Sequence, residues 1–255
     1  MSQPIQSQDV FMSGGSVPAR SYRVATPSDW TIVFAHGGGF SWGTLDDYDQ
    51  IARNLCAATG GEVISVDYRL APEHPFPRAL DDVCGVLREV LGQGSDRVII
   101  AGDSAGACLA AGAAQRMRDE GARKIAGQLL IYPMIEHYDR TPNAFHTLSD
   151  RFHPSFAAVR NAWDKYLQVP GGQLPNYAVP TRTAPLEGLP PAMTIVAEND
   201  PLRFEALAYA EAMAKAGVPS ISSSYAETVH GFLNEAPEGA VADALNAIKA
   251  WVATL

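Results

Sequence analysis

One stretch decides the fold: RVIIA at positions 97–101 runs directly into GDSAG at positions 102–106. The first half is an apolar, β-branched run, typical of a buried strand. The small residues from Ala105 to Arg118 then read as a helix. A serine between such a strand and helix stands at a sharp turn that exposes its hydroxyl at the sheet edge, and the flanking glycines accommodate strained backbone. Ser104 is therefore a candidate nucleophile.

A serine hydroxyl needs a base to activate it, and the base needs an acid to orient it. After a strand–turn–helix serine, these partners are expected in the order acid, then histidine, each following a late strand. Asp200 follows the apolar run at 192–197, and His230 follows the run at 219–225. Both therefore fall at the carboxyl edge of a parallel sheet, where functional groups collect.

Other acids stay open at this point. Glu198 is nearer to its strand, and Glu136 follows the predicted strand at 127–132. Asp200 also suits the N-cap of a helix over 202–216, a role compatible with facing the histidine. His137, His146 and His153 lie among polar residues without the spacing of metal ligands, so no metal site is expected.

A third element of the site lies upstream. The predicted strand at 31–35 runs into HGGGF at 36–40. Acyl transfer places negative charge on the former carbonyl oxygen, which backbone N–H groups stabilise. Glycines allow the main chain to approach a substrate closely. The residue after the nucleophile, Ala105, supplies a further N–H.

Four segments together carry a family resemblance: HGGGF at 36–40; VDYRLAPEHPFP at 66–77 with ALDD at 79–82; GDSAG at 102–106; and DPL at 200–202 with HGF at 230–232. The chain resembles the hormone-sensitive-lipase-like branch of the α/β-hydrolases, a group of carboxylesterases. The resemblance implies a triad of Ser104, Asp200 and His230. It also implies an oxyanion hole built from Gly38, Gly39 and Ala105, with His36 and residues 68–77 as scaffold.

The resemblance and the strand pattern predict an α/β-hydrolase fold with a mostly parallel sheet of about eight strands flanked by helices. Strands are expected at 9–12, 22–25, 31–35, 62–67, 97–101, 127–132, 192–197 and 220–225, and helices at 45–58, 78–91, 105–118, 154–167, 202–216 and 239–252. Residues 1–255 are expected to form one domain. Residues 133–191 break the strand–helix alternation, with one helix between Pro- and Gly-rich flanks, and are expected to form a lid-like insertion. Members of the family carry an N-terminal helical cap, whereas residues 10–26 read as strands, so a reduced cap is expected.

Bulk composition narrows the class of protein. With 255 residues, 47% of them hydrophobic, the chain is long enough for one large core. A net charge of −9 argues against a nucleic-acid surface, and no apolar run reaches membrane-spanning length. The odd set Cys56, Cys84 and Cys108 reads as reduced core thiols, and residues 1–8 lack a signal-peptide core, so a cytoplasmic location is expected. No cofactor is expected, and a homodimer remains open.

Position along the chain suggests which side chains line the cleft. Phe40 and Trp42 follow the glycines, Leu202 follows the acid and Phe232 follows the histidine, although each is equally suited to core packing. The sequence thus predicts a serine carboxylesterase for small short-chain esters that works through an acyl-enzyme. Two alternatives remain. An amidase or arylformamidase would use the same triad, and a non-catalytic ligand receptor would share the fold, although such receptors in this family lose the catalytic histidine.

Overall fold

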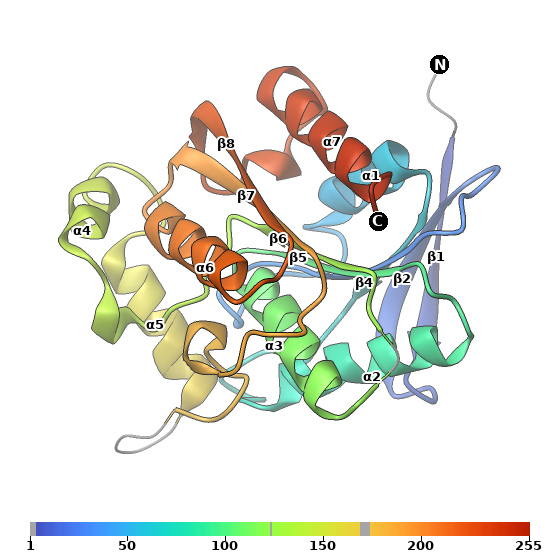
Figure 1. The fold of residues 1–255 in the computed structure, drawn as a ribbon, viewed down its shortest axis with the longest axis horizontal. Coiled ribbons are helices and arrows are strands. Elements are labelled where there is room, and N and C mark those ends of the chain that lie inside the picture. Colours follow the sequence, from blue (N-terminus) through green and yellow to red (C-terminus); the bar gives the residue numbers. More distant parts are fainter. Residues whose placement is uncertain (1–3, 123, 169–173) are drawn as a thin grey trace.

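A computed structural model describes residues 4–122, 124–168 and 174–255. The described residues form an eight-stranded sheet in the order β1-β2-β4-β3-β5-β6-β7-β8. Strands β1 and β2 pair antiparallel, as do β2 and β4, and all other neighbours are parallel. The predicted α/β-hydrolase fold with a mostly parallel sheet is confirmed (Figure 1).

The described residues hold eight strands, seven α-helices and three short 3₁₀ turns. The strands are β1 Ile5–Met12, β2 Val17–Val24, β3 Thr31–Ala35, β4 Glu62–Val66, β5 Val98–Asp103, β6 Gly127–Ile131, β7 Ala192–Asn199 and β8 Ser220–Val229. The α-helices are α1 Asp49–Thr59, α2 Arg78–Gly92, α3 Ala105–Asp119, α4 Asn143–Ser149, α5 Phe156–Leu167, α6 Arg203–Lys215 and α7 Gly239–Val252. Short 3₁₀ turns lie at Tyr138–Arg140, Pro180–Arg182 and Phe232–Asn234.

Two apolar clusters fill the two faces of the sheet, because successive strand side chains point to opposite sides. On β3, Val33 packs with α2 and α3, whereas Ile32 and Phe34 pack with α1 and α7. Figure 1 shows the same layers, with α2, α3 and α6 on one face and α1 and α7 on the other. Both faces of the central strands are therefore covered, which explains their continuous apolar sequences.

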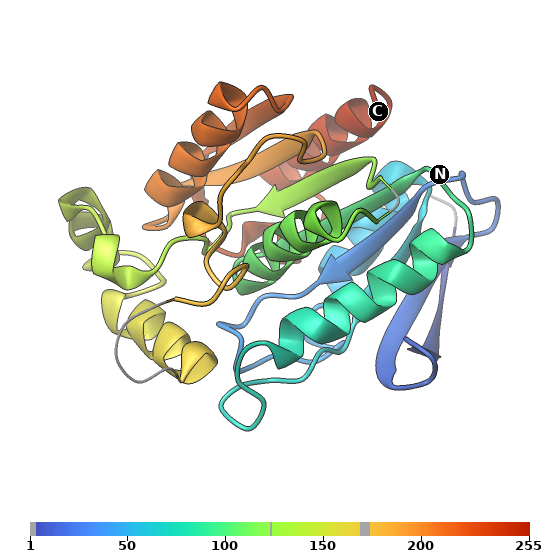
Figure 2. The same cartoon turned by 60° about the horizontal axis from the view of Figure 1, so that its bottom comes forward.

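The insertion predicted at 133–191 leaves the sheet after β6 and returns at β7. It holds α4 and α5, and Figure 2 shows both helices beyond the end of the sheet toward which β6 runs. Helix α5 begins after Ser155, whose hydroxyl accepts a hydrogen bond from the N–H of Ala158. Its inner face buries Trp163 and Tyr166 in the same core as α3. Residues 169–173 of this segment lie outside the described residues.

Several element boundaries differ from the sequence-based expectation. The first two strands are longer than predicted and form a hairpin over residues 5–24. Helix α1 begins at Asp49 rather than Leu45, and α4 was not predicted. The seven residues of α4 bury only Phe145, so their sequence carries little apolar periodicity to reveal a helix. No helix in the described part of the chain has the length and apolar character needed to cross a bilayer.

The turn between β5 and α3 packs so closely against its neighbours that two of its glycines have no room for a side chain. A Cβ on Gly106 would lie 2.0 Å from the carbonyl oxygen of Ala35, and a Cβ on Gly102 would lie 2.2 Å from the carbonyl oxygen of Gly106. Both obstacles are backbone atoms, which cannot swing aside. Helix α3 therefore packs against the end of β3 at a distance that only glycine permits.

We expect Gly106→Ala to lower the free energy of unfolding by at least about 2 kcal/mol, since the added methyl group forces backbone apart in a packed region. Gly92→Ala is the matched control, because nothing lies within 4 Å of the Cβ it would add at the end of α2. Urea unfolding followed by circular dichroism measures both. Equal midpoints for Gly106→Ala and the parent protein would contradict the tight-contact interpretation.

Candidate active site

Three side chains predicted from the sequence lie in hydrogen-bond contact. Ser104 Oγ is 2.9 Å from His230 Nε2, and His230 Nδ1 is 2.7 Å from Asp200 Oδ2. Ser104 follows β5, Asp200 follows β7 and His230 follows β8, so the carboxyl ends of three parallel strands bring them together. The arrangement leaves Nδ1–H to donate to the carboxylate and Nε2 to accept from the hydroxyl.

The backbone of Ser104 is strained in the manner expected of an exposed nucleophile. Its φ is 53° and its ψ is −120°, a region that L-residues rarely adopt. The Ser104 N–H donates to the carbonyl of Ile131 at 2.9 Å, which ties the turn to β6. The conformation aims Oγ at the imidazole, and the contact of Gly102 with Gly106 maintains it.

Asp200 holds two partners at once. Its Oδ2 faces His230, while its Oδ1 accepts a hydrogen bond from the N–H of Leu202 at 2.9 Å. Helix α6 begins at Arg203, with Leu202 at the N-cap, so Asp200 stands just before the helix rather than at its cap. The carboxylate is 1% exposed, and the second hydrogen bond fixes its plane toward the histidine.

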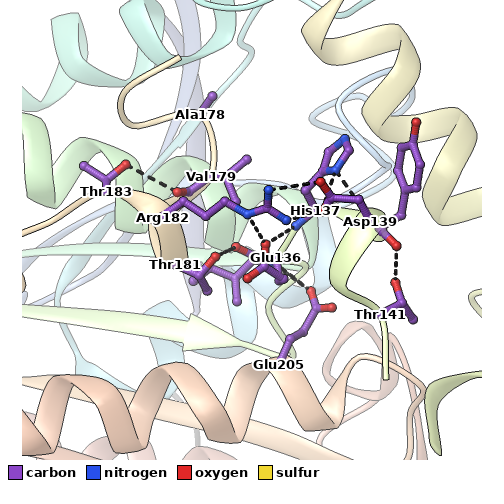
Figure 3. A network of polar contacts seen from close by, with 12 residues as sticks. Glu136, His137, Asp139, Thr141, Ala178, Val179, Thr181, Arg182, Thr183 and Glu205 are labelled. Atoms are coloured by element: carbon purple, nitrogen blue, oxygen red, sulfur yellow. Dashed lines mark hydrogen bonds and ion pairs between the residues drawn. The ribbon is translucent and has the colours of Figure 1, made fainter. Parts of the chain in front are cut away.

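The two rival acids point elsewhere. Glu198 accepts a hydrogen bond from the N–H of Glu227. Glu136 lies 2.7 Å from Nε of Arg182, in the polar network of Figure 3. Both carboxylates are thus held by partners other than the histidine, and His230 donates its Nδ1–H to Asp200 instead.

Figure 3 also shows how the segment after β6 is anchored to α6. Glu205 Oε1 accepts hydrogen bonds from the N–H groups of Ile135, at 2.7 Å, and Glu136, at 3.2 Å. Burial raises the pKa of Glu205 to about 8, while these two N–H groups act in the opposite direction. Because Met134, the neighbour of Ile135, lines the cavity described below, the network fixes one wall of the site.

Opposing effects act on the imidazole of His230. Burial disfavours the charged ring, but the charge of Asp200, its hydrogen bond and the charge of Asp103 together outweigh burial and raise the pKa of His230 above its ordinary value. The ring packs against Tyr132, with centroids 4.9 Å apart. The following turn is held by Asn54, whose amide donates to the carbonyls of Leu233 and Glu235. Both contacts fix the ring orientation.

The glycine loop after β3 approaches the nucleophile closely. Gly38 has φ of 95°, and a Cβ there would lie 1.9 Å from the carbonyl oxygen of Trp42, so no other residue fits. The N–H groups of Ser41 and Trp42 both donate to the carbonyl of Gly38. Gly38 and Gly39 line the same cavity as Ser104. Ala105 opens α3, where the first N–H groups have no partner within the helix.

The aromatic rings of His36, Tyr48 and Tyr68 pack beneath the glycine loop, on its side toward the core. His36 is fully buried between the rings of Tyr48 and Tyr68, with centroids 4.9 and 4.4 Å away. Burial lowers the pKa of His36 to about 4, so the ring is neutral and its Nδ1–H donates to the carbonyl of Gly37. The Tyr68 hydroxyl donates to the carbonyl of His36 at 2.7 Å. These contacts account for the polar and aromatic residues around the glycines.

A cavity of about 350 Å³ opens above Ser104. Polar groups from several loops and apolar groups from the insertion share its wall. It is lined by Gly38, Gly39, Ser41, Trp42, Tyr48, Asp103, Ser104, Met134, His153, Pro154, Ala158, Val159, Asn161, Ala162, His230, Gly231 and Asn234. The segment 133–191 therefore contributes much of the cavity wall, and its Ala162 lies against Gly39 of the glycine loop.

Of the four side chains expected to line the cleft, only Trp42 does so, and it is 59% exposed. The expectation is wrong for Phe40, Leu202 and Phe232, which are buried in the core. Phe40 turns inward with φ of 60° and stacks on Tyr166 of α5, with centroids 3.9 Å apart. Position next to a motif does not decide the direction of a side chain, because packing against distant segments does.

The structure adds lining residues that the sequence analysis did not select. Asp103 lies within the quoted pentapeptide, and His153 was weighed only as a metal ligand. The His153 ring centroid is 6.3 Å from that of His230, and burial followed by the His230 charge lowers the pKa of His153. Tyr48 and Asn234 complete the polar wall. The signal that could have identified Asp103 is its place directly before Ser104, the candidate nucleophile, as a carboxylate at the end of an apolar strand.

The arrangement is chemically competent for acyl transfer. A hydroxyl faces an imidazole nitrogen, a buried carboxylate accepts from the other nitrogen, and glycine backbone held by scaffold residues borders the same cavity. Among residues 4–122, 124–168 and 174–255, no cluster of three or more His, Cys, Asp or Glu side chains is placed to hold a metal ion.

Comparison with known proteins places the chain among esterases. Residues 32–234 match a family described as having an alpha/beta hydrolase fold. Carboxylesterase NlhH of Mycobacterium tuberculosis is 40% identical over 223 residues, a match that covers 80% of this chain and 66% of the relative, just under two thirds of its length.

Solved structures agree with that placement. The thermostable carboxylesterase EstE1, cloned from a metagenomic library, superposes with a TM-score of 0.90 at 33% identity and covers 100% of this chain and 90% of its own. An esterase from the bacterial hormone-sensitive lipase family gives 0.91 at 27% identity, covering 100% and 86%. The chain belongs to the α/β-hydrolase fold family, in its hormone-sensitive-lipase-like esterase branch.

Proposed function

We propose that the protein is a serine carboxylesterase that hydrolyses small, short-chain acyl esters. The observation that carries the proposal is the unbroken hydrogen-bond chain Ser104–His230–Asp200 at the floor of a cavity bordered by Gly38 and Gly39. The names of the relatives support the reaction class, since they are carboxylesterases and carboxylic ester hydrolases. The chemistry of the site supports it independently.

In the proposed reaction, Ser104 Oγ attacks the ester carbonyl carbon while His230 Nε2 takes the hydroxyl proton. Asp200 keeps the imidazole in the Nδ1–H tautomer and stabilises the imidazolium that forms. The imidazolium then protonates the ester oxygen of the leaving group, the bond from the acyl carbon to that oxygen breaks, and the alcohol departs to leave the acyl-serine and a neutral imidazole. Water attacks the acyl carbon while His230 takes one of its protons; the bond to Ser104 Oγ then breaks, the imidazolium returns the proton to Oγ, and the acid product departs.

The tetrahedral intermediate carries negative charge on the former carbonyl oxygen. The N–H groups of Gly38, Gly39 and Ala105 are the proposed donors, since all three lie on backbone that borders Ser104. Losing one such donor costs about 3 kcal/mol of transition-state stabilisation. Helix α3 adds the positive end of its dipole at the same place.

The size of the cavity supports small substrates. Its volume of about 350 Å³ lies at the lower end of ligand sites and must hold both the acyl and the alcohol part. Tyr48, Asp103, His153 and Asn161 make parts of the wall polar, which reduces the apolar surface available to a long acyl chain. Dissolved esters are therefore the proposed substrate class.

Ser104→Ala should reduce kcat by at least about 10³-fold, because the nucleophile is removed while binding and oxyanion contacts remain. A fluorophosphonate probe should label the parent protein at Ser104 and leave the variant unlabelled, as read by peptide mass spectrometry. Ser222→Ala is the control, since Ser222 lies exposed on β8. Labelling of another residue in active enzyme would refute the assignment.

Asp200→Asn should reduce kcat by about 10⁴-fold, because an amide facing His230 no longer fixes the productive tautomer. Glu136→Gln and Glu198→Gln are matched carboxylate-to-amide controls and should retain activity, since their hydrogen bonds go to groups other than the histidine. Steady-state kinetics on one chromogenic ester compares the three. An inactive Glu136→Gln beside an active Asp200→Asn would move the role to Glu136.

Across p-nitrophenyl esters, kcat/KM should peak between acetyl and butyryl and then fall. Each buried methylene adds about 0.8 kcal/mol of binding, roughly fourfold in kcat/KM, only while the cavity has room for it. A parallel series that varies the alcohol at constant acetyl group separates the two parts of the site. A continuous rise to long-chain esters, with a jump when the substrate forms an emulsion, would contradict the small-ester assignment.

A further inference from the structure

Asp103 is a buried carboxylate that the proposed reaction does not yet use. It is the last residue of β5, directly before Ser104, and it is 4% exposed. Its Oδ1 accepts a hydrogen bond from the N–H of Gly37 at 2.7 Å. Gly37 precedes the two glycines that border the cavity, so the carboxylate joins the nucleophile strand to the glycine loop.

The packing around this hydrogen bond leaves little freedom. A Cβ on Gly37 would lie 2.7 Å from Asp103 Oδ2 and 3.2 Å from the Cβ of Ser104. The glycine loop therefore rests directly on the carboxylate and on the base of the nucleophile. Removing the carboxylate would leave a buried N–H without its acceptor, which is costly in a packed interior.

The charge of Asp103 acts on the imidazole. Burial raises the pKa of Asp103 to about 7, while the charge of His230 and the hydrogen bond from Gly37 favour the ionised form. In return, Asp103 is one of the two carboxylates that raise the pKa of His230, the other being Asp200. Asp200 contacts Nδ1 directly, whereas Asp103 acts through space.

We infer that Asp103 is a positioning residue of the reaction: by accepting the Gly37 N–H, its carboxylate holds the loop that presents the Gly38 and Gly39 N–H groups beside Ser104. The loop contact matters most as the transition state forms, because the oxyanion appears only then. The charge of Asp103 supports the same role, since the imidazolium of His230 forms together with the oxyanion. The inference rests on the proposed esterase function and adds a residue to its machinery.

Other titratable groups face the same region from each element packed against it. Burial raises the pKa values of Tyr48, Tyr68 and Tyr132, each of which also feels the charge of Asp103, so the three phenols stay neutral near pH 7. His36 is neutral for the reason given above. The groups with shifted pKa values that bear on the pH profile are Asp103, His230 and His153, together with Glu205 behind the cavity wall at Met134.

Two substitutions separate the hydrogen bond from the charge. Asp103→Asn keeps an oxygen acceptor for Gly37 but removes the anion. We expect kcat to fall about tenfold and the acid limb of kcat/KM to move to lower pH, because the imidazolium loses a stabilising charge. Asp103→Leu removes both, and we expect kcat to fall at least about 100-fold with KM changed less than about threefold.

A transition-state analogue gives a readout that structural damage alone would not move. A boronic acid forms a tetrahedral adduct with the active-site serine, and its affinity should fall in parallel with kcat while the KM of the ester stays near that of the parent protein. Asp243→Asn removes one exposed charge from α7 and should leave the pH profile unchanged. Thermal unfolding confirms that the variants fold.

An unchanged acid limb and parent-like kcat in Asp103→Asn would overturn the role of the charge, and a loss confined to KM in Asp103→Leu would overturn the role in the oxyanion loop. If Asp103→Leu does not fold, Asp103→Asn still decides the charge effect. Failure of the proposed function is distinct, because it would appear as an inactive parent protein or an active Ser104→Ala.

Discussion

The close approach of α3 to the end of β3 is the contact on which the rest of the active site depends. Gly106 rests on the carbonyls of Ala35 and His36, the last residue of β3 and the first of the loop after it. Because β3 and β5 are neighbours, this contact brings the glycine loop after β3 beside the serine turn after β5. The positions of Ser104, the proposed nucleophile, and of the glycine N–H groups near it thus depend on one close backbone contact.

His230 and Asp200, the proposed base and acid, come from strands farther along the sheet. Strands β7 and β8 lie on the far side of β6 from β5, and the loops after them fold back over the sheet edge. Short-range contacts hold each loop. Asp200 bonds to Leu202, and the turn after His230 is held by Asn54 of α1. The histidine is therefore fixed from the opposite face of the sheet, which couples the site to both apolar cores.

The sequence predicted correctly those features that depend on neighbouring residues in the chain. The apolar strands, the serine turn and the glycines after β3 are short-range features, and their order along the chain fixes the edge at which they meet. It failed for Phe40, whose ring stacks on Tyr166, a residue far along the chain in the insertion. The sequence analysis quoted the GDSAG motif but proposed no role for its Asp103. The burial of this carboxylate under the glycine loop results from the pairing of β3 with β5, which the motif alone does not reveal.

Two buried carboxylates beside one imidazole raise the question of why both are retained, since burying a charge is unfavourable. Their geometry separates them. Asp200 accepts a hydrogen bond from a ring nitrogen, so its proposed role is to fix the tautomer and orientation of His230. Asp103 accepts a hydrogen bond from the N–H of Gly37, beside the proposed oxyanion donors, and it interacts with His230 only through charge. In the proposed reaction, Asp200 therefore orients the base His230, whereas Asp103 holds the glycine loop that borders Ser104.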